Sequence, residues 1–164
     1  MTNSIHISKD INKLNVLDLN ELKSLAAKHQ RYRFCLHENE SSAIQEMIIC
    51  LKGQNYFNPH RHPEGVVESY HMIEGSMDVF YFNDLGDIIG KTRLSALNGG
   101  NTEDHFFHKI SAPIYHTVFT RTDWAIYHEV VTGPWSDSTS EVASFAPQDK
   151  QNINAFMKQL NEYN

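Results

Sequence analysis

The sequence predicts an all-β domain, a sandwich or barrel, with one helix before it and one helix after it. Between residues 31 and 132 the chain consists of short apolar or alternating runs, separated by turns rich in glycine, proline, asparagine and aspartate. Roughly eight such runs at this spacing are typical of a β-sandwich or barrel. Apolar residues recur at helical spacing only near the two ends. Strands and helices do not alternate, which argues against a doubly wound α/β sheet.

The first helix is expected at residues 18–29, in the segment DLNELKSLAAKHQ, where Leu19 and Leu22 begin an apolar face. Asp18 is the expected N-cap, and Glu21 follows three residues later as in a capping box.

The strands of the β domain are expected in AIQEMIICLK, NYFNPHRH, VVESYHMIE, HFFHKI, IYHTVFT and WAIYHEVVT, with a hairpin in SMDVFYFNDLGDIIGKTRL. Asn83, Asp84 and Gly86 supply the turn of that hairpin. The second helix is expected at residues 147–163, with Pro147 in its first turn.

A chain of 164 residues suits one domain with a single core. We expect an N-terminal extension with a helix at residues 1–30, a barrel at residues 31–135, and a C-terminal tail with a helix at residues 136–164.

Composition excludes several kinds of partner. A formal net charge of −6 argues against binding to nucleic acid or to anionic membranes. The apolar runs are far too short to span a bilayer. Cys35 and Cys50 both lie beside apolar residues and are expected to be buried thiols in a reducing compartment. Because no secretory signal is readable, we expect a cytoplasmic protein.

Residues 59–75, PHRHPEGVVESYHMIEG, contain three histidines and three glutamates. On a strand, His60 and His62 point to the same face about 6.5–7 Å apart, and two imidazoles so placed can bind one ion. The turn after them is expected to form a hairpin with the next strand. On that strand Glu68 and His71 lie on opposite faces, so the alternation alone leaves open which of them is the third ligand.

This region resembles the first cupin motif, a glycine followed by His-x-His, a glutamate and a second glycine. Here the pattern is Gly53, His60-Arg61-His62, Glu68 and Gly75. The interval from glutamate to glycine matches, and the other two intervals are each about one residue longer. The resemblance selects Glu68.

The second cupin motif supplies a histidine from a strand that follows a proline-containing turn, and SAPIYHTV offers His116 in that role, without the motif's glycine. The resemblance thus implies a metal site of His60, His62, Glu68 and His116. Such a shell suits Fe(II), Mn(II), Ni(II) or Zn(II).

A longer stretch, residues 31–135, resembles the WbuC-type cupin-fold metalloproteins. The shared string runs from RYRFCLH through AIQEMIICL, YFNPHRH and ESYHMIEG to HEVVTGPW. The resemblance implies a cupin double-stranded β-helix, also called a jelly-roll barrel, that binds a divalent metal and is associated with O-antigen (surface-polysaccharide) biosynthesis.

Several residues are expected on the metal side of the barrel from the match and from strand alternation. Glu129 is the candidate catalytic base. Gln45, Tyr56 and Tyr70 on this side are candidate substrate-binding residues, and Met47 and Phe80 are expected on the same side. Arg33, which precedes these strands, is a further candidate substrate-binding residue. Arg31 and Arg33 are expected to form surface ion pairs, with a phosphate or carboxylate clamp as the alternative. His71 and His128 are expected in the sheet or at its surface, and His6, His29 and His37 outside the barrel strands.

Four functions remain open from the sequence. The first is an isomerase- or epimerase-like enzyme that acts on a small polar substrate, such as a sugar or nucleotide-sugar intermediate. The others are a non-catalytic metal-dependent module that binds small molecules, an Fe(II) oxygenase, and a metal-free acid–base catalyst. Cupins commonly pair through edge strands, so a homodimer is expected.

Overall fold

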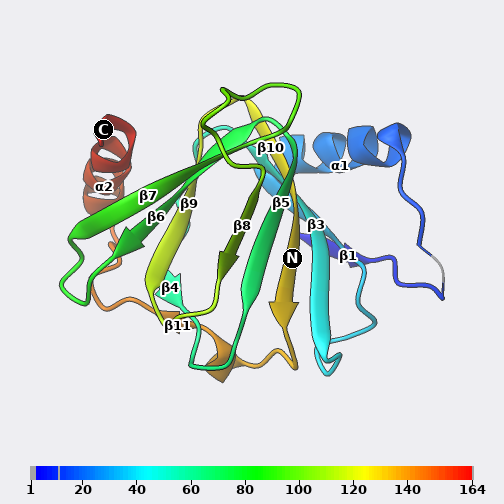
Figure 1. The fold of residues 1–164 in the computed structure, drawn as a ribbon, viewed down its shortest axis with the longest axis horizontal. Helices are drawn as coiled ribbons and strands as arrows, with labels where there is room; N and C mark the ends of the chain where they lie inside the picture. Colours follow the sequence, from blue (N-terminus) through cyan, green and yellow to red (C-terminus); the bar gives the residue numbers. More distant parts are fainter. Residues whose placement is uncertain (1–2, 11, 164) are drawn as a thin grey trace.

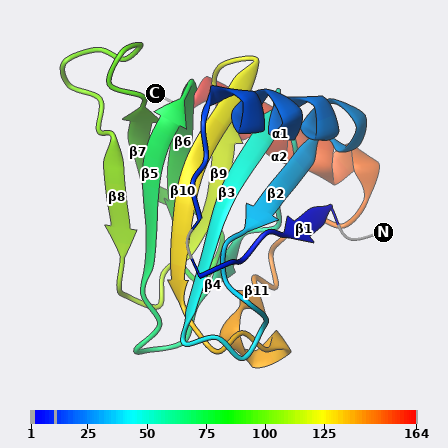
Figure 2. The same ribbon diagram turned by 90° about the vertical axis from the view of Figure 1, so that its right-hand side faces the viewer.

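The computed structural model describes residues 3–10 and 12–163 and shows two stacked β-sheets with a helix against the outer face of each (Figures 1 and 2). The elements in chain order are β1 (Ser4–His6), α1 (Val16–His29), β2 (Arg31–Cys35), β3 (Ile44–Lys52), β4 (His60–Arg61), β5 (Glu68–Glu74), β6 (Ser76–Phe82), β7 (Ile88–Ser95), β8 (Phe107–Ile110), β9 (Tyr115–Thr120), β10 (Trp124–Thr132), the 3-10 helix η1 (Asp137–Thr139), β11 (Glu141–Val142) and α2 (Lys150–Glu162).

The strand order is that of a jelly roll. One sheet has the order β1-β2-β3-β10-β5-β8, and the other has the order β11-β4-β9-β6-β7. Successive strands from β3 to β10 are therefore shared between the sheets in the way that two interlocked Greek keys produce. The all-β jelly-roll prediction, with a helix at each end, is confirmed.

Three apolar clusters hold the layers together. The cluster between the sheets includes Met47 and Ile49 of β3 together with Tyr127 of β10. On the other face of β3, Ile48 and Cys50 pack against α1. Helix α1 covers this face, so consecutive residues of β3 are all buried, and this explains the unbroken apolar run MIIC.

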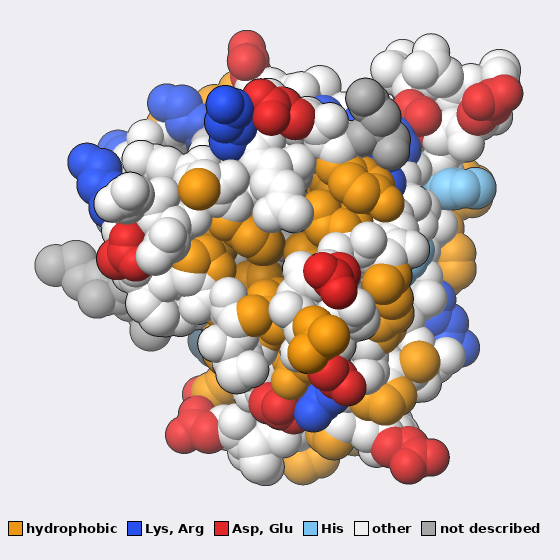
Figure 3. All heavy atoms as spheres, turned by 90° about the vertical axis from the view of Figure 1, so that its left-hand side faces the viewer, with side chains coloured by type: hydrophobic (Ala, Val, Ile, Leu, Met, Phe, Trp, Pro, Cys, Tyr) orange, Lys and Arg blue, Asp and Glu red, His pale blue; other side chains and the backbone are white. Residues whose placement is uncertain are grey.

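The outer face of the five-stranded sheet packs against the C-terminal segment. This third cluster includes Phe80 of β6, Phe119 of β9 and Leu160 of α2. Figure 3 shows this side of the molecule, where hydrophobic side chains remain visible between polar and charged ones. Phe156 and Met157 of α2 pack against this cluster and are only partly buried.

A buried carboxylate links β6 to the neighbouring strands on this face. Asp78 of β6 is fully buried and accepts hydrogen bonds from the guanidinium groups of Arg93 and Arg121. Arg121 also donates to the backbone oxygen of Leu160 at 3.0 Å, so the same cluster fixes the end of α2.

Both helices begin at positions that differ from those expected. Helix α1 starts at Val16, because the side chain of Asn15 accepts a hydrogen bond from Leu17 N at 2.7 Å and acts as the N-cap. Asp18 is the second half of this capping box, since its carboxylate accepts from Asn15 N at 2.6 Å. Helix α2 starts at Lys150 after the N-cap Asp149, so the expectations for Asp18 as N-cap and for Pro147 as a helical residue are wrong.

The terminal segments add strands that were not expected. Strand β1 pairs in parallel with β2, and β11 pairs with β4, so each sheet gains a strand from beyond residues 31–135. The expected strand at NYFNPHRH shrinks to His60–Arg61, and the residues before it are irregular. Neither helix in the described part of the chain is long and apolar enough to cross a membrane.

Candidate metal centre

Three histidines and a glutamate from both sheets meet inside the barrel. His60 of β4 lies directly opposite His116 of β9 in the five-stranded sheet, and His62 follows β4. Glu68 begins β5 in the six-stranded sheet. The expected hairpin between the His-x-His segment and the next strand is therefore wrong, because Glu68 reaches the histidines from the opposite sheet. One ligand atom from each of the four residues lies within 4.8 Å of the others.

Backbone carbonyls fix the orientation of all three imidazoles. The Nδ1 atoms of His60, His62 and His116 lie 3.1, 2.6 and 3.0 Å from the carbonyl oxygens of Asn58, Thr139 and Ile114. A carbonyl only accepts hydrogen bonds, so each Nδ1 carries a proton and donates it. Each Nε2 is then the atom left to bind a cation, as in many metal sites where the second ring nitrogen is held by the protein.

The arrangement leaves buried polar atoms without partners. Within the described residues, His62 Nε2, His116 Nε2 and Glu68 Oε2 are buried and have no hydrogen bond. His116 Nε2 and His62 Nε2 lie 2.9 and 3.5 Å from Glu68 Oε2. Unpaired buried polar atoms cost free energy, and a cation would satisfy all three at once. The donor set of three imidazoles and one carboxylate thus fits a divalent transition metal.

Protonation at these residues reflects burial and mutual charge. Burial, together with the neighbouring His116, lowers the pKa of His60 to about 4, so this ring is neutral at neutral pH. Burial also opposes charge on His62, but its contact with Glu68 outweighs burial and raises the His62 pKa. The pKa of Glu68 is lowered, because His116 and His62 outweigh the opposing effect of burial. Protons and a cation therefore compete for the same atoms.

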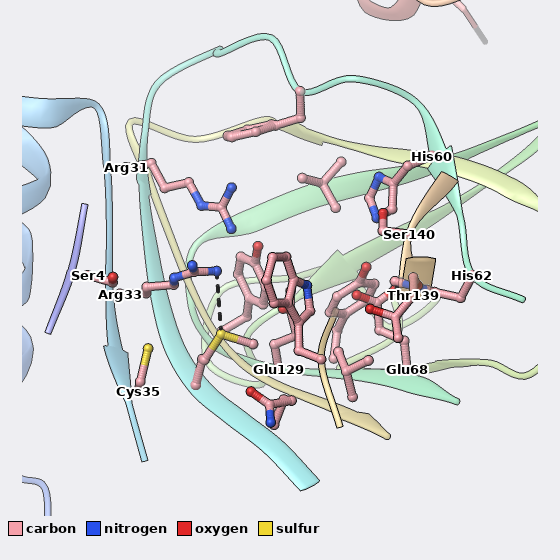
Figure 4. A pocket seen from close by; sticks show the side chains of 18 of the residues that line it. Ser4, Arg31, Arg33, Cys35, His60, His62, Glu68, Glu129, Thr139 and Ser140 are labelled. Atoms are coloured by element: carbon pink, nitrogen blue, oxygen red, sulfur yellow. Dashed lines mark hydrogen bonds and ion pairs between the residues drawn. The ribbon is translucent and has the colours of Figure 1, made fainter. Parts of the chain in front are cut away.

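A cavity of about 470 Å³ extends from these residues into the barrel. Figure 4 shows His60, His62 and Glu68 at one end, Arg31, Arg33 and Cys35 at the other, and Glu129 between them. Of the residues expected on the metal side, those that line the cavity are Gln45, Met47, Tyr70 and Glu129, and the candidate substrate-binding residue Arg33 lines it as well.

Two residues expected on the metal side lie elsewhere. Tyr56 belongs to the irregular stretch before β4, where strand alternation does not apply, and its ring packs against Phe156 of α2. Phe80 lies on the outer face of β6 against Phe119. Because both faces of β6 are covered, it carries apolar residues on both faces, and the sequence does not indicate which face points into the barrel.

Gln45 lines the cavity, but its amide nitrogen is already engaged. Its Nε2 lies 3.2, 3.1 and 3.0 Å from the backbone oxygens of Asn39, Glu40 and Ser42. The side chain thereby fixes the turn before β3, and its donors have no capacity left for a ligand.

Arg31 and Arg33 are free to meet a ligand. They alternate along β2 with residues that face α1, so both guanidinium groups point into the cavity. Within the described residues neither takes part in an ion pair, and the expected surface pairing is not found. Arg33 Nη1 instead lies 3.7 Å from Met47 Sδ, and Arg31 lies over the ring of Phe57.

Glu129 of β10 is a half-buried carboxyl group in the middle of the cavity. Burial and the negative charge of Glu68 raise its pKa to about 7, although Arg31 and Arg33 oppose this shift. At neutral pH this group can therefore both accept and return a proton.

The raised pKa of Glu129 has a measurable consequence for stability. The folded protein holds the Glu129 proton up to about pH 7, whereas the unfolded chain loses it near the ordinary value of 4.5, so folding is disfavoured progressively as pH rises between these values. We expect Glu129→Gln to stabilise the metal-free protein, relative to wild type, by about 2 kcal/mol more at pH 8 than at pH 5. Urea unfolding at the two pH values, with the exposed Glu38→Gln as control, measures this difference. A gain that is the same at both pH values would contradict the assignment.

Sequence reasoning missed part of the cavity wall. His6 lies on β1, so the expectation that it lies outside the barrel strands is wrong, whereas His37 follows β2 and lies outside the strands as expected. Both nevertheless line the cavity, together with Cys35 of β2. The alternation of Arg31, Arg33 and Cys35 along one face of β2 was the available signal. His71 and His128 lie on the outer face as expected, where their rings stack at 5.9 Å.

The strand order and the site together identify the fold. Jelly rolls with this order include the cupins, and the His-x-His, glutamate and later histidine lie at their cupin positions inside the barrel. The chain has a cupin fold. Several solved structures are similar to this chain in fold. A structural-genomics protein from Shewanella oneidensis matches with a TM-score of 0.53 and 10% identity over 75% of this chain and 73% of that chain.

Two further solved structures are similar to the cupin barrel. The capsular polysaccharide assembling protein CapF from Staphylococcus aureus matches with a TM-score of 0.52 and 12% identity over 68% of this chain, which spans 29% of CapF. A Cupin_2 domain of an XRE-family transcriptional regulator from Enterobacter cloacae matches with a TM-score of 0.46 and 15% identity over 65% of this chain and 99% of that domain. At such identities the likeness concerns the fold alone.

Sequence comparisons add one family. Residues 14–94 match the model of a family described as a domain of unknown function, DUF6016. No curated protein matches the chain.

Proposed function

We propose that this cupin barrel binds a divalent cation, Fe(II), Mn(II), Ni(II) or Zn(II), through His60, His62, Glu68 and His116. The observation that carries the proposal is the convergence of three carbonyl-anchored imidazoles and a carboxylate around buried atoms that lack partners. The cation supplies a Lewis acid that stabilises negative charge on a substrate oxygen.

The substrate that fits this cavity is small, polar and negatively charged. Arg31 and Arg33 lack ion-pair partners among the described residues and face the cavity, so they can bind a carboxylate or phosphate through paired hydrogen bonds. Tyr70 adds a wall of the cavity beside Glu68. A molecule held at the arginines extends past Glu129 toward the metal ligands (Figure 4).

Glu129 is the proposed catalytic base. It lies in the cavity between the arginines and the metal ligands, where its carboxylate can remove a proton from the carbon next to a substrate carbonyl and return it to the neighbouring carbon or to the opposite face of the same carbon. Return to the neighbouring carbon, with the hydroxyl proton of that carbon moving to the former carbonyl oxygen, is an isomerisation, whereas return to the opposite face of the same carbon, after the enolate has turned over, is an epimerisation. The WbuC-type resemblance of residues 31–135 supports a sugar or nucleotide-sugar intermediate of surface-polysaccharide biosynthesis, and the capsular polysaccharide role of CapF, a protein of the same fold, makes sugar nucleotides the first substrates to test.

Proton exchange with solvent tests the reaction directly. The metal-loaded protein is incubated in D₂O with a panel of sugar nucleotides and phosphorylated keto-sugars, and deuterium at the carbon next to the carbonyl is followed by NMR. We expect incorporation by the wild-type protein, at least about 100-fold slower incorporation by Glu129→Gln, and unchanged ligand binding by that variant. Binding without exchange would instead support a non-catalytic module, and iron-dependent oxygen consumption would support an oxygenase.

Charge recognition has its own test. We expect Arg33→Gln to weaken binding of phosphorylated ligands by roughly 10-fold or more, because a hydrogen bond to a charged group is lost. Neutral sugars provide the control, since their binding does not use this charge. Equal loss for both ligand classes, measured by calorimetry, would contradict the role of Arg33.

A homodimer is our proposal for the assembly. Strand β8 is the outermost strand of its sheet, and Phe106 and Phe107 at this edge are 49% and 42% exposed. An exposed edge with aromatic side chains favours pairing with a second copy. Light scattering on the purified protein distinguishes a dimer from a monomer.

A further inference from the structure

A second group of metal-binding side chains lies at the other end of the cavity. Strands β1 and β2 pair in parallel with His6 beside Cys35, and His37, two residues beyond the end of β2, lines the same cavity. One ligand atom from each of the three lies within 4.8 Å of the others. The rings of His6 and His37 meet edge to face with centroids 5.1 Å apart.

We propose that His6, Cys35 and His37 form a second metal site, for a thiophilic transition-metal ion such as zinc or copper. Two imidazoles and a thiolate are donors that these ions prefer, and they differ in kind from the three imidazoles and one carboxylate of the first site. The thiol proton leaves to solvent when the sulfur binds, so a divalent ion with one thiolate retains a single positive charge.

The backbone holds the two imidazoles for this purpose. His6 Nδ1 lies 3.2 Å from the carbonyl oxygen of His37, so it carries a proton and leaves Nε2 as the donor atom. His37 Nδ1 lies 3.0 Å from both the carbonyl oxygen and the backbone nitrogen of Glu46. In the tautomer that carries its proton on Nδ1 and donates it to the Glu46 carbonyl, the Nε2 atom of His37 is free to bind an ion.

The sulfur atom is available and the site is open to solutes. Cys35 is a free thiol that is 2% exposed, and Cys50, the other cysteine, packs in the cluster beneath α1. His6 is exposed and His37 is half-buried, and both line the same cavity as Cys35. An ion can therefore enter from the cavity, and three protein ligands leave a fourth position for water or a ligand atom.

Cobalt absorption distinguishes this site from the first. Co(II) bound to a thiolate gives a charge-transfer band in the near ultraviolet, and the first site contains no sulfur. We expect the wild-type protein to bind two Co(II) ions per chain and to show this band. Cys35→Ser should bind one ion and lose the band, whereas the control Cys50→Ser should bind two ions and keep it.

Two more variants keep the test independent of folding and of the first site. His6→Gln changes an exposed residue on a short edge strand. We expect it to lower the affinity for the ion that gives the charge-transfer band by about 10-fold or more. His116→Ala should abolish binding of the ion at the first site, which gives no such band, and keep the charge-transfer band of the second site. Absence of the band from wild-type protein at saturating Co(II), or its persistence in Cys35→Ser, would overturn the second site without affecting the first.

Discussion

His116→Ala is expected to abolish metal binding at the site in the barrel centre. His116 is completely buried, is held by the Ile114 carbonyl, and approaches Glu68 to 2.9 Å. Removing even a residue that merely orients a metal ligand lowers affinity by roughly 10–100-fold, so removing the ligand itself should cost more than 100-fold. Titration of metal-free protein with Zn(II) against a competing chelator measures the change, with Cys35→Ser present in all proteins compared so that only this site binds. In that Cys35→Ser background, the rise in melting temperature that the metal produces should disappear when His116 is replaced.

A matched histidine shows whether the effect is specific. His71 lies on β5, the strand that carries Glu68, but points to the outer face. His71→Ala should therefore retain wild-type affinity. His60→Ala, at a half-buried position, serves as a second ligand variant if His116→Ala is poorly folded. Wild-type affinity in both ligand variants would refute the assignment of this centre.

Asp78→Ala is expected to lower the free energy of unfolding by about 3–5 kcal/mol. The carboxylate is fully buried and neutralises Arg93 and Arg121, and its loss leaves two guanidinium groups without their anion. Because Arg121 also donates to Leu160, the end of α2 should loosen as well. Urea unfolding measures the first effect, and hydrogen exchange in α2 measures the second.

An exposed ion pair of the same chemistry is the control. Asp84 is 83% exposed and pairs with Arg61 at 3.2 Å. Asp84→Ala should cost less than about 1 kcal/mol, since water replaces the lost partner. Destabilisation of similar size in the two variants would show that the burial of Asp78 contributes nothing.

Strands could be predicted where buried and exposed residues alternate, or where a turn has a characteristic sequence. On β5, Glu68, Tyr70 and Met72 are buried and alternate with more exposed residues, so the strand could be predicted, but the cupin resemblance was needed to select the face that carries Glu68. The hairpin of β6 and β7 was also predictable, because Asn83 closes its turn through backbone nitrogens. These signals are local and need no knowledge of the partner strand.

Other features depend on contacts that the sequence does not encode locally. Phe80 lies on a strand covered on both faces, so its orientation could not be inferred from alternation. His6 joins the cavity only because β1 pairs with β2, and a three-residue strand in a polar segment gives no periodic signal. The contribution of Glu68 from the opposite sheet depends on the crossing of strands between sheets, which a motif does not specify.

The segment after residue 135 takes part in the metal centre although it supplies none of its four donors. The Thr139 carbonyl orients the ring of His62, and β11 pairs with β4, the strand on which His60 lies. A domain boundary placed at residue 135, where the composition becomes polar, therefore separates these supporting contacts from the four donor residues. A fragment limited to residues 31–135 would keep every donor side chain, yet it would lose the oxygen atom that aims one of them.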